Sequence, residues 1–211
     1  MNIGIIGSGK VGAALGRAWA HRNHCVFYSY SRDAEKLKKL AHDAGHGARS
    51  GSPEEAAQFG EVILLATPWS KTMDVLETLG DLTGKIVIDA TNPANEGTFE
   101  LEVGFSESGA ELIAKKIPEA HVIKAFNSTG VGNLENPRYG RESLTMPICG
   151  DHEISKSLVI RLAEDLGFDS VDAGPLDNAR LLEPFGMLWT YLAAANEHDT
   201  DIGFRLLKRS S

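Results

Sequence analysis

A glycine motif near the start of the chain, Gly7-x-Gly9-x-x-Gly12, constrains the fold more than any other feature. It follows a short run rich in isoleucine that suits a buried parallel strand, and a helical pattern of apolar residues begins directly after it. In such a unit the first glycine permits a tight turn, the second lets backbone approach a pyrophosphate, and the third lets the helix pack closely on the strand. Amide groups at the helix start would hold the pyrophosphate. The motif predicts a dinucleotide site formed by Gly7, Ser8, Gly9, Lys10, Val11 and Gly12, with an ordinary strand–helix turn as the alternative.

The end of the second predicted strand, residues 24–30, indicates which dinucleotide is bound. An acidic residue at this point would hydrogen-bond the ribose 2′-hydroxyl of NAD. Ser31 and Arg32 stand there instead, with Lys36 one turn into the next helix. A hydroxyl, a guanidinium and an ammonium would bind a 2′-phosphate, which a carboxylate would repel. We therefore predict NADP(H); the alternative is that Arg32 and Lys36 are solvated helix charges.

Three further strands are expected to end at the same edge of the sheet. Residues 61–66 form the clearest buried strand, and Ala66, Thr67 and Pro68 at its end would pass beside the cofactor ribose. Residues 85–89 lead to Asn92 and Pro93, where the Asn92 amide would face the nicotinamide or, alternatively, form an Asx turn before the proline. Residues 121–125 lead to Asn127. Trp69 would wall the site or be an ordinary loop aromatic.

The alternation of strands and helices predicts an α/β fold with a doubly wound, mainly parallel Rossmann sheet. We place the NADP-binding Rossmann domain at residues 1–175 and a small C-terminal helical segment at residues 176–211. The helix at 178–195 is too apolar around its circumference to be solvated, so it should cover the sheet or pair with a twin. The glycine-bearing stretch 127–143 is either a lid or an idle loop.

Composition excludes several classes of function. The 211-residue chain carries a net charge of −8, which argues against nucleic acid or an anionic membrane as its main partner. Its two cysteines suggest neither a disulfide framework nor a metal site, and the histidines lack ligand spacing, so we expect no metal. A first strand beginning at residue 2 leaves no room for a signal peptide, and no apolar run could span a membrane. We expect a cytoplasmic protein.

Taken together, these motifs resemble the deazaflavin-dependent NADP oxidoreductases. The matching pieces include the glycine loop, Ser31-Arg32, Ala66-Thr67-Pro68-Trp69, Ile88-Asp89-Ala90-Thr91-Asn92-Pro93, Lys124-Ala125-Phe126-Asn127, Cys149-Gly150-Asp151, Asp172-Ala173-Gly174-Pro175-Leu176 and Arg180-Leu181-Leu182-Glu183. The cytosolic domain of six-transmembrane metalloreductases is similar too, with a flavin as acceptor. The resemblance implies a homodimer that passes hydride between NADPH and a small-molecule carrier, the 5-deazaflavin coenzyme or a flavin. It also implies that Ser31, Arg32 and Lys36 contact NADP, and that Thr67-Pro68 and Asn92-Pro93 lie on the nicotinamide side. Residues 127–143 depart from the family pattern.

No catalytic residue can be assigned from the sequence. Many dehydrogenases need a general acid or base beside the reacting group, and their Rossmann-plus-helical forms carry it in a large second domain. Only about 35 residues follow Pro175 here, and no Tyr-x-x-x-Lys pair is present. A planar carrier needs little acid–base help from side chains. We predict hydride exchange with such a carrier; a reductase of a small organic substrate and a non-catalytic NADP(H)-binding module remain as alternatives.

Overall fold

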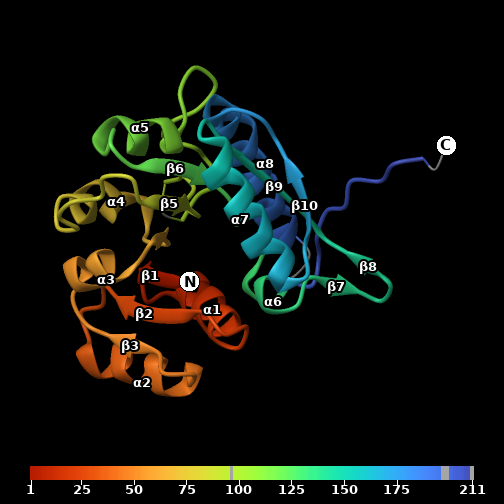
Figure 1. The fold of residues 1–211 in the computed structure, drawn as a ribbon. Coiled ribbons are helices and arrows are strands. Elements are labelled where there is room, and N and C mark those ends of the chain that lie inside the picture. The colour runs from red at the N-terminus through yellow and green to blue at the C-terminus, as the bar shows by residue number, and fades with distance from the viewer. Residues whose placement is uncertain (96, 196–199, 210–211) are drawn as a thin grey trace.

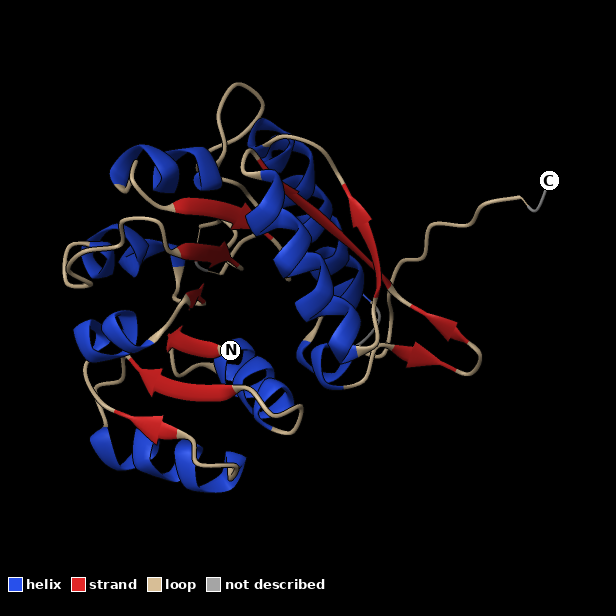
Figure 2. Ribbon diagram, in the orientation of Figure 1, coloured by secondary structure: helices blue, strands red, loops and turns tan. Residues whose placement is uncertain are grey.

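The computed structural model describes residues 1–95, 97–195 and 200–209. Helices cover both faces of a central sheet, and a small hairpin projects from one end (Figures 1 and 2). The strands are β1 Asn2–Ile6, β2 Cys25–Ser29, β3 Arg49–Ser50, β4 Val62–Leu65, β5 Ile86–Asp89, β6 His121–Lys124, β7 Arg138–Tyr139, β8 Glu142–Ser143, β9 Thr145–Gly150 and β10 Asp169–Asp172. The helices are α1 Lys10–Ala20, α2 Ala34–Ala44, α3 Pro53–Phe59, α4 Trp69–Leu76, α5 Gly109–Lys116, α6 Val131–Glu135, α7 Glu153–Leu166, the 3₁₀ turn η1 Leu176–Asn178 and α8 Ala179–Ala195.

The strand order in the main sheet is β10-β9-β6-β5-β4-β1-β2-β3. All pairings from β3 to β6 are parallel, and only β9 runs antiparallel to its neighbour β6. Strand order reverses direction between β1 and β4, which is where ligands bind in open α/β sheets. The predicted doubly wound, mainly parallel Rossmann fold is confirmed.

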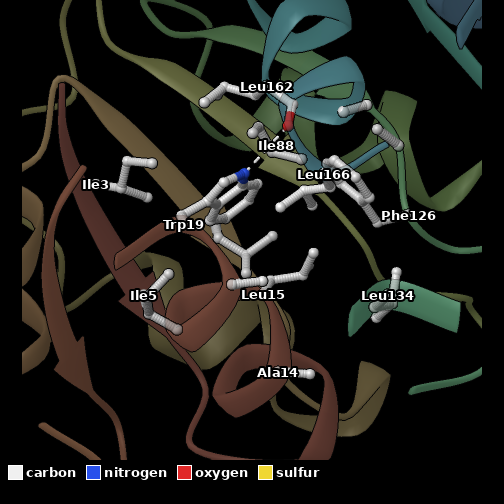
Figure 3. Packing of buried hydrophobic residues seen from close by; sticks show 14 of the residues in the cluster. Ile3, Ile5, Ala14, Leu15, Trp19, Ile88, Phe126, Leu134, Leu162 and Leu166 are labelled. Atoms are coloured by element: carbon white, nitrogen blue, oxygen red, sulfur yellow. Dashed lines mark hydrogen bonds between the residues drawn. The ribbon is translucent and has the colours of Figure 1, made fainter. Parts of the chain in front are cut away.

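Each face of the sheet has its own apolar core, because successive strand residues point to opposite faces. One core joins the sheet to α1, α2, α6 and α7, and the other joins it to α3, α4, α5 and α8. Trp19 is fully buried at the centre of the first core, where its indole N–H donates to the carbonyl of Leu162 on α7 (Figure 3). Leu176, Ala179 and Leu182 belong to the second core, so the C-terminal segment packs on the sheet.

Helix termini follow the signals in the sequence. Ser52 and Ser108 form capping boxes at the starts of α3 and α5. Gly167 ends α7 in the left-handed conformation, with φ of 100°. No helix in the described ranges is long and apolar enough to cross a bilayer.

The stretch from 127 to 143 is more regular than a loop. It contains the short helix α6 and the β7–β8 hairpin, whose strands are only two residues long. Such short elements have too few residues to show a period in the sequence. Tyr139 anchors the hairpin by donating its hydroxyl to Asn133 of α6 at 2.8 Å.

Helix α8 covers the sheet on one side, as its apolar composition suggested. Trp189 is only 8% exposed and donates its indole N–H to the carbonyl of Ile202. The opposite side of the helix leaves Leu181, Leu188 and Tyr191 exposed at 67%, 48% and 54%. Their helical spacing places these three residues on one side of α8, and we call them the outer stripe.

Candidate functional site

The carboxyl ends of five parallel strands lie level at one edge of the sheet. Ile6 of β1 is the register partner of both Ser29 and Leu65. Leu65 in turn pairs with Asp89, and Asp89 with Lys124. The loops that follow these strands therefore emerge side by side, which places the predicted site residues on a common edge.

A cavity of about 960 Å³ opens at this edge beside β1, β2 and β4. It is lined by the glycine loop, by the ends of β2 and β4, and by the first turns of α2, α3 and α4. Its lining residues are Gly7, Ser8, Gly9, Tyr30, Ser31, Arg32, Asp33, Ala34, Lys36, Leu37, Gly51, Ser52, Pro53, Ala66, Pro68 and Lys71.

The three glycines of the motif serve different physical purposes. Gly7 has φ of +126°, and a Cβ there would lie 2.4 Å from the carbonyl oxygen of Ala66. A Cβ on Gly12 would lie 2.0 Å from the carbonyl oxygen of Gly7, so this glycine lets α1 pack on the loop. A Cβ on Gly9 would meet no atom within 4 Å. Gly9 therefore leaves room for a ligand in the cavity, while Gly7 and Gly12 maintain the fold.

The start of α1 is free to bind an anion. Gly9 caps the helix without a side-chain hydrogen bond, and no acidic residue lies in the first turn. Helices α2, α3, α5 and α7 have a capping side chain, whereas α4 and α6 begin uncapped like α1. Backbone N–H groups at an uncapped helix start carry partial positive charge and favour phosphate groups.

Three cationic side chains border the cavity. Arg32 and Lys36 are exposed, and Ser31 stands beside them. The carboxylate of Asp33 also borders the cavity. It is held at the start of α2, where it accepts hydrogen bonds from the amides of Glu35 and Lys36. The third cation is Lys71 on α4, which our sequence analysis missed. The available signal was its position as the third residue of the helix that follows Pro68.

Several predicted site residues do not line this cavity. They are Lys10, Val11, Gly12, Thr67, Asn92, Pro93 and Asn127. Thr67 is buried and its hydroxyl lies 3.0 Å from that of Thr72. Trp69, proposed as a wall, is half-buried and packs in the core beside α5. The cavity thus brings together the start of the glycine loop, Ser31, Arg32 and Lys36 with Pro68, whereas Asn92, Pro93 and Asn127 lie outside it.

Asn92 and Asn127 bind each other at the ends of β5 and β6, and we call them the amide pair. The Asn92 Nδ2 donates to the Asn127 carbonyl at 2.9 Å, and the Asn127 Nδ2 donates to Asn92 Oδ1 at 2.9 Å. The Asn127 Nδ2 also donates to the carbonyl of Leu182 on α8. Asn127 is 6% exposed, yet its Oδ1 atom accepts no hydrogen bond. The pair therefore presents a buried, unused acceptor.

Beneath the amide pair lies a second feature that the sequence analysis missed. Asp89, Lys124 and Glu183 are each 0% exposed and form what we call the buried trio. Lys124 Nζ lies 2.8 Å from Asp89 Oδ2 and 2.9 Å from Glu183 Oε1. Burial disfavours the Lys124 ammonium, but the two carboxylates outweigh it and raise the pKa of Lys124. Opposite charges end two neighbouring apolar strands, which is a sequence signal for Asp89 and Lys124 but not for Glu183.

No group of three or more His, Cys, Asp or Glu side chains that could hold a metal ion occurs among the described residues. Cys149, the buried cysteine, is also unsuited to thiolate chemistry. Burial raises the pKa of its thiol to about 12.

Comparison with known proteins agrees with this geometry. Residues 2–93, which include the glycine loop, the cations and Asn92, match the family described as NADP oxidoreductase, coenzyme F420-dependent. The predicted family resemblance is confirmed. The matched family is described by its NADP-dependent oxidoreductase activity, and the description names coenzyme F420 as its partner.

Similar proteins are found both by sequence and by structure. The metalloreductase STEAP3 of Rattus norvegicus is 30% identical over 182 residues, which are 86% of this chain and 35% of that protein. The chain thus spans about a third of that relative. A crystal structure from Arthrobacter sp. FB24, provisionally named an F420-dependent NADP-reductase, superposes with a TM-score of 0.89 at 23% identity, covering 99% of this chain and 100% of that one. The NADP-bound pyrroline carboxylate reductase of Plasmodium falciparum superposes with a TM-score of 0.60 at 18% identity over 93% of this chain and 67% of its own.

Proposed function

We propose that the chain binds NADPH across the carboxyl edge and passes its hydride to a planar carrier, either the 5-deazaflavin coenzyme or a flavin. The observation that carries the NADPH half is the cavity at the β1–β4 switch point. There, Gly9 leaves open space beside the uncapped start of α1. Arg32 and Lys36 border the same cavity where a 2′-phosphate would lie.

The nicotinamide end supports the choice of acceptor. Among the described residues at this end, Asn92 and Asn127 are amides, which orient a ligand without exchanging protons. The charged groups nearby, in the buried trio, are paired with one another and fully enclosed. When bound, NADPH supplies the hydride. A planar carrier accepts it without a protein acid at the reacting atom, whereas an imine or carbonyl requires proton delivery.

The decisive experiment follows NADPH absorbance with the 5-deazaflavin coenzyme, FMN, FAD and riboflavin tested in parallel. We expect one of these carriers to oxidise NADPH well above the rate without protein. Reduction of an imine or carbonyl with no added carrier would establish the organic-substrate alternative. Tight NADPH binding with no oxidation by any acceptor would establish a non-catalytic binding module.

We also propose that the outer stripe of α8 pairs with a second copy of the chain. Leu181, Leu188 and Tyr191 carry no charge, and a two-fold axis would place the same apolar residues opposite each other. Light scattering should report a dimer for the wild type. Leu188→Lys should shift it to monomer, and a wild-type monomer would refute the proposal.

A further inference from the structure

The buried trio is a complete ionic network inside the fold. Lys124 Nζ donates to Asp89 Oδ2, to Glu183 Oε1 and, at 2.6 Å, to the carbonyl of Thr91, so all three ammonium protons are used. Glu183 also accepts from the amides of Gly109 and Ala110 at the start of α5. The two carboxylates thus accept hydrogen bonds from Lys124, from backbone amides and from the hydroxyl of Thr91. Buried ion pairs of this kind often add no stability over apolar packing, so the trio needs another explanation.

The trio controls the backbone on both sides of the amide pair. Asp89 Oδ1 accepts from the amide and the hydroxyl of Thr91 at 2.9 and 2.7 Å. With its carbonyl held by Lys124, Thr91 is fixed from both ends, and Asn92 follows it directly. On the other side, Glu183 fixes the turn of α8 in which Leu182 offers its carbonyl to Asn127.

The orientation of the Asn127 amide is forced by these neighbours. Its two contacts, Asn92 Oδ1 and the carbonyl of Leu182, are both acceptors at this site, so the Asn127 Nδ2 must face them. Asn92 cannot turn over, because its own Nδ2 faces the Asn127 carbonyl. The remaining atom, Asn127 Oδ1, is therefore held as a free acceptor. A buried acceptor left without a donor is unfavourable unless a ligand supplies one.

Helix α8 leaves the amide pair little room to move. A Cβ on Gly186 would lie 2.6 Å from the Asn127 carbonyl oxygen and 3.0 Å from the Nδ2 atoms of both asparagines. The helix backbone thus rests on the pair, and Glu183 fixes the same helix one turn earlier.

We propose that Lys124, Asp89 and Glu183 are positioning residues that hold Asn127 Oδ1 ready to accept a hydrogen bond from the carboxamide amino group of nicotinamide. The inference rests on the proposed function, because it presupposes that NADP(H) occupies the edge. The trio would orient the nicotinamide ring, and the cavity would supply the affinity for the adenosine half.

The test compares three ligands. NADP⁺ has the carboxamide, its 3-acetylpyridine analogue has a methyl ketone without N–H donors, and 2′,5′-ADP has only the adenosine half. The wild type should bind NADP⁺ about tenfold more tightly than the analogue, the effect of one hydrogen bond to a buried acceptor. In the variant combining Asp89→Asn, Lys124→Met and Glu183→Gln, this ratio should fall to about two, while 2′,5′-ADP binds as before.

A matched control is Lys156→Met on α7. Lys156 is also buried, at 2% exposed, and also contacts two carboxylates, those of Glu153 and Asp172 at 3.0 Å. It lies away from the amide pair, so the NADP⁺-to-analogue ratio should stay about tenfold. A ratio lowered equally by the control would mean that loss of any buried lysine disturbs the site, and would overturn the proposal.

The remaining outcomes each point to one conclusion. If the neutral trio still discriminates about tenfold, the trio is purely structural. If the wild type binds NADP⁺ and the analogue equally, Asn127 does not contact the carboxamide. Failure of the wild type to bind 2′,5′-ADP would instead refute the proposed function.

A milder variant covers the case in which the triple variant misfolds and loses 2′,5′-ADP binding. Glu183→Gln alone leaves a neutral Lys124–Asp89 pair and keeps the shape of the glutamate side chain. An NADP⁺-to-analogue ratio near three in this variant would support the proposal, and an unchanged ratio would overturn it.

Discussion

The two ends of the carboxyl edge treat charge in opposite ways. At the adenosine end Arg32, Lys36 and Lys71 are exposed around an open cavity. At the nicotinamide end Asp89 and Lys124 are fully enclosed and hydrogen-bonded. Exposed cations keep their hydration until an anion arrives, so they suit a highly charged ligand. Enclosed ions instead fix the backbone around them, which suits a ring that must be oriented.

The comparison separates affinity from orientation, and the largest expected effect tests the affinity side. Arg32→Ala should weaken NADPH binding on the order of 10- to 100-fold, because a charge-assisted hydrogen bond to the 2′-phosphate contributes roughly 1.5–3 kcal/mol. NADH, which lacks this phosphate, should bind as before. The measurement is a pair of dissociation constants for each protein. Lys38→Ala is the control, since Lys38 lies on the same helix but pairs with Glu35 outside the cavity. Equal weakening of both cofactors would make Arg32 a general surface charge.

Two glycines of the loop allow a test that separates effects on NADPH binding from effects on stability. Gly9→Ala should weaken NADPH binding by about tenfold with little change in melting temperature, because the added Cβ projects into open space. Gly12→Ala should destabilise the fold by roughly 1–3 kcal/mol, because its Cβ would overlap the carbonyl of Gly7. Calorimetry and NADPH titration of both variants check the pair. Unchanged NADPH affinity in Gly9→Ala would place the pyrophosphate elsewhere.

Lys71 offers a smaller effect at the same end. It lines the cavity from α4, so Lys71→Ala should weaken NADPH and NADH alike by roughly two- to fivefold, the range of an exposed charge. The difference in affinity between the wild type and Lys71→Ala should be smaller at high salt, because ions screen exposed charges. Titrations at low and high ionic strength measure it. A change confined to NADPH would instead make Lys71 a ligand of the 2′-phosphate.

The smallest effect concerns the attachment of α8 to α5 at the enclosed end. Hydrogen bonds from Arg180 hold the pKa of Glu111 at about 2, below its usual range. A lowered carboxyl pKa stabilises the fold above about pH 4.5, and this contribution is lost as pH falls towards about 2. Arg180→Ala should therefore lower the melting temperature by roughly 2–4 °C at pH 7 and by less at pH 3. NADPH affinity should not change.

Melting curves at the two pH values, with Arg161→Ala on the exposed side of α7 as control, test this expectation. If Arg180→Ala lowers the melting temperature equally at both pH values, Glu111 is not the partner of Arg180 in solution.

The residues that we predicted for the adenosine end could be chosen from the sequence because local spacing sets their positions. The glycine loop, Ser31 and Arg32 each follow a strand within a few positions, and the register of the sheet then aligns them. The trio could not be recognised in this way. Asp89 and Lys124 read as the ends of apolar strands and Glu183 as an ordinary helix charge, and only the β5–β6 register and the packing of α8 bring them together.

Lys71 could not be recognised for a related reason. It lines the cavity because of the direction in which α4 leaves the sheet, and α4 packs on α5, which is distant in the sequence. The free Asn127 Oδ1 is likewise a property of three partners from separate elements. Local periodicity carries no information about contacts between elements that are distant in the sequence.

The spacing of these residues along the chain has a consequence for biosynthesis. The last residue that lines the cavity is Lys71, whereas the trio and the amide pair stay incomplete until α8 has left the ribosome. Ribosomes add roughly 5–20 residues each second, so the two ends of the edge are completed seconds apart. The residues that line the cavity are therefore synthesised first, and the helix that completes the nicotinamide end is synthesised last. Truncation before Glu183 would leave Lys124 and Asp89 without the helix that encloses them.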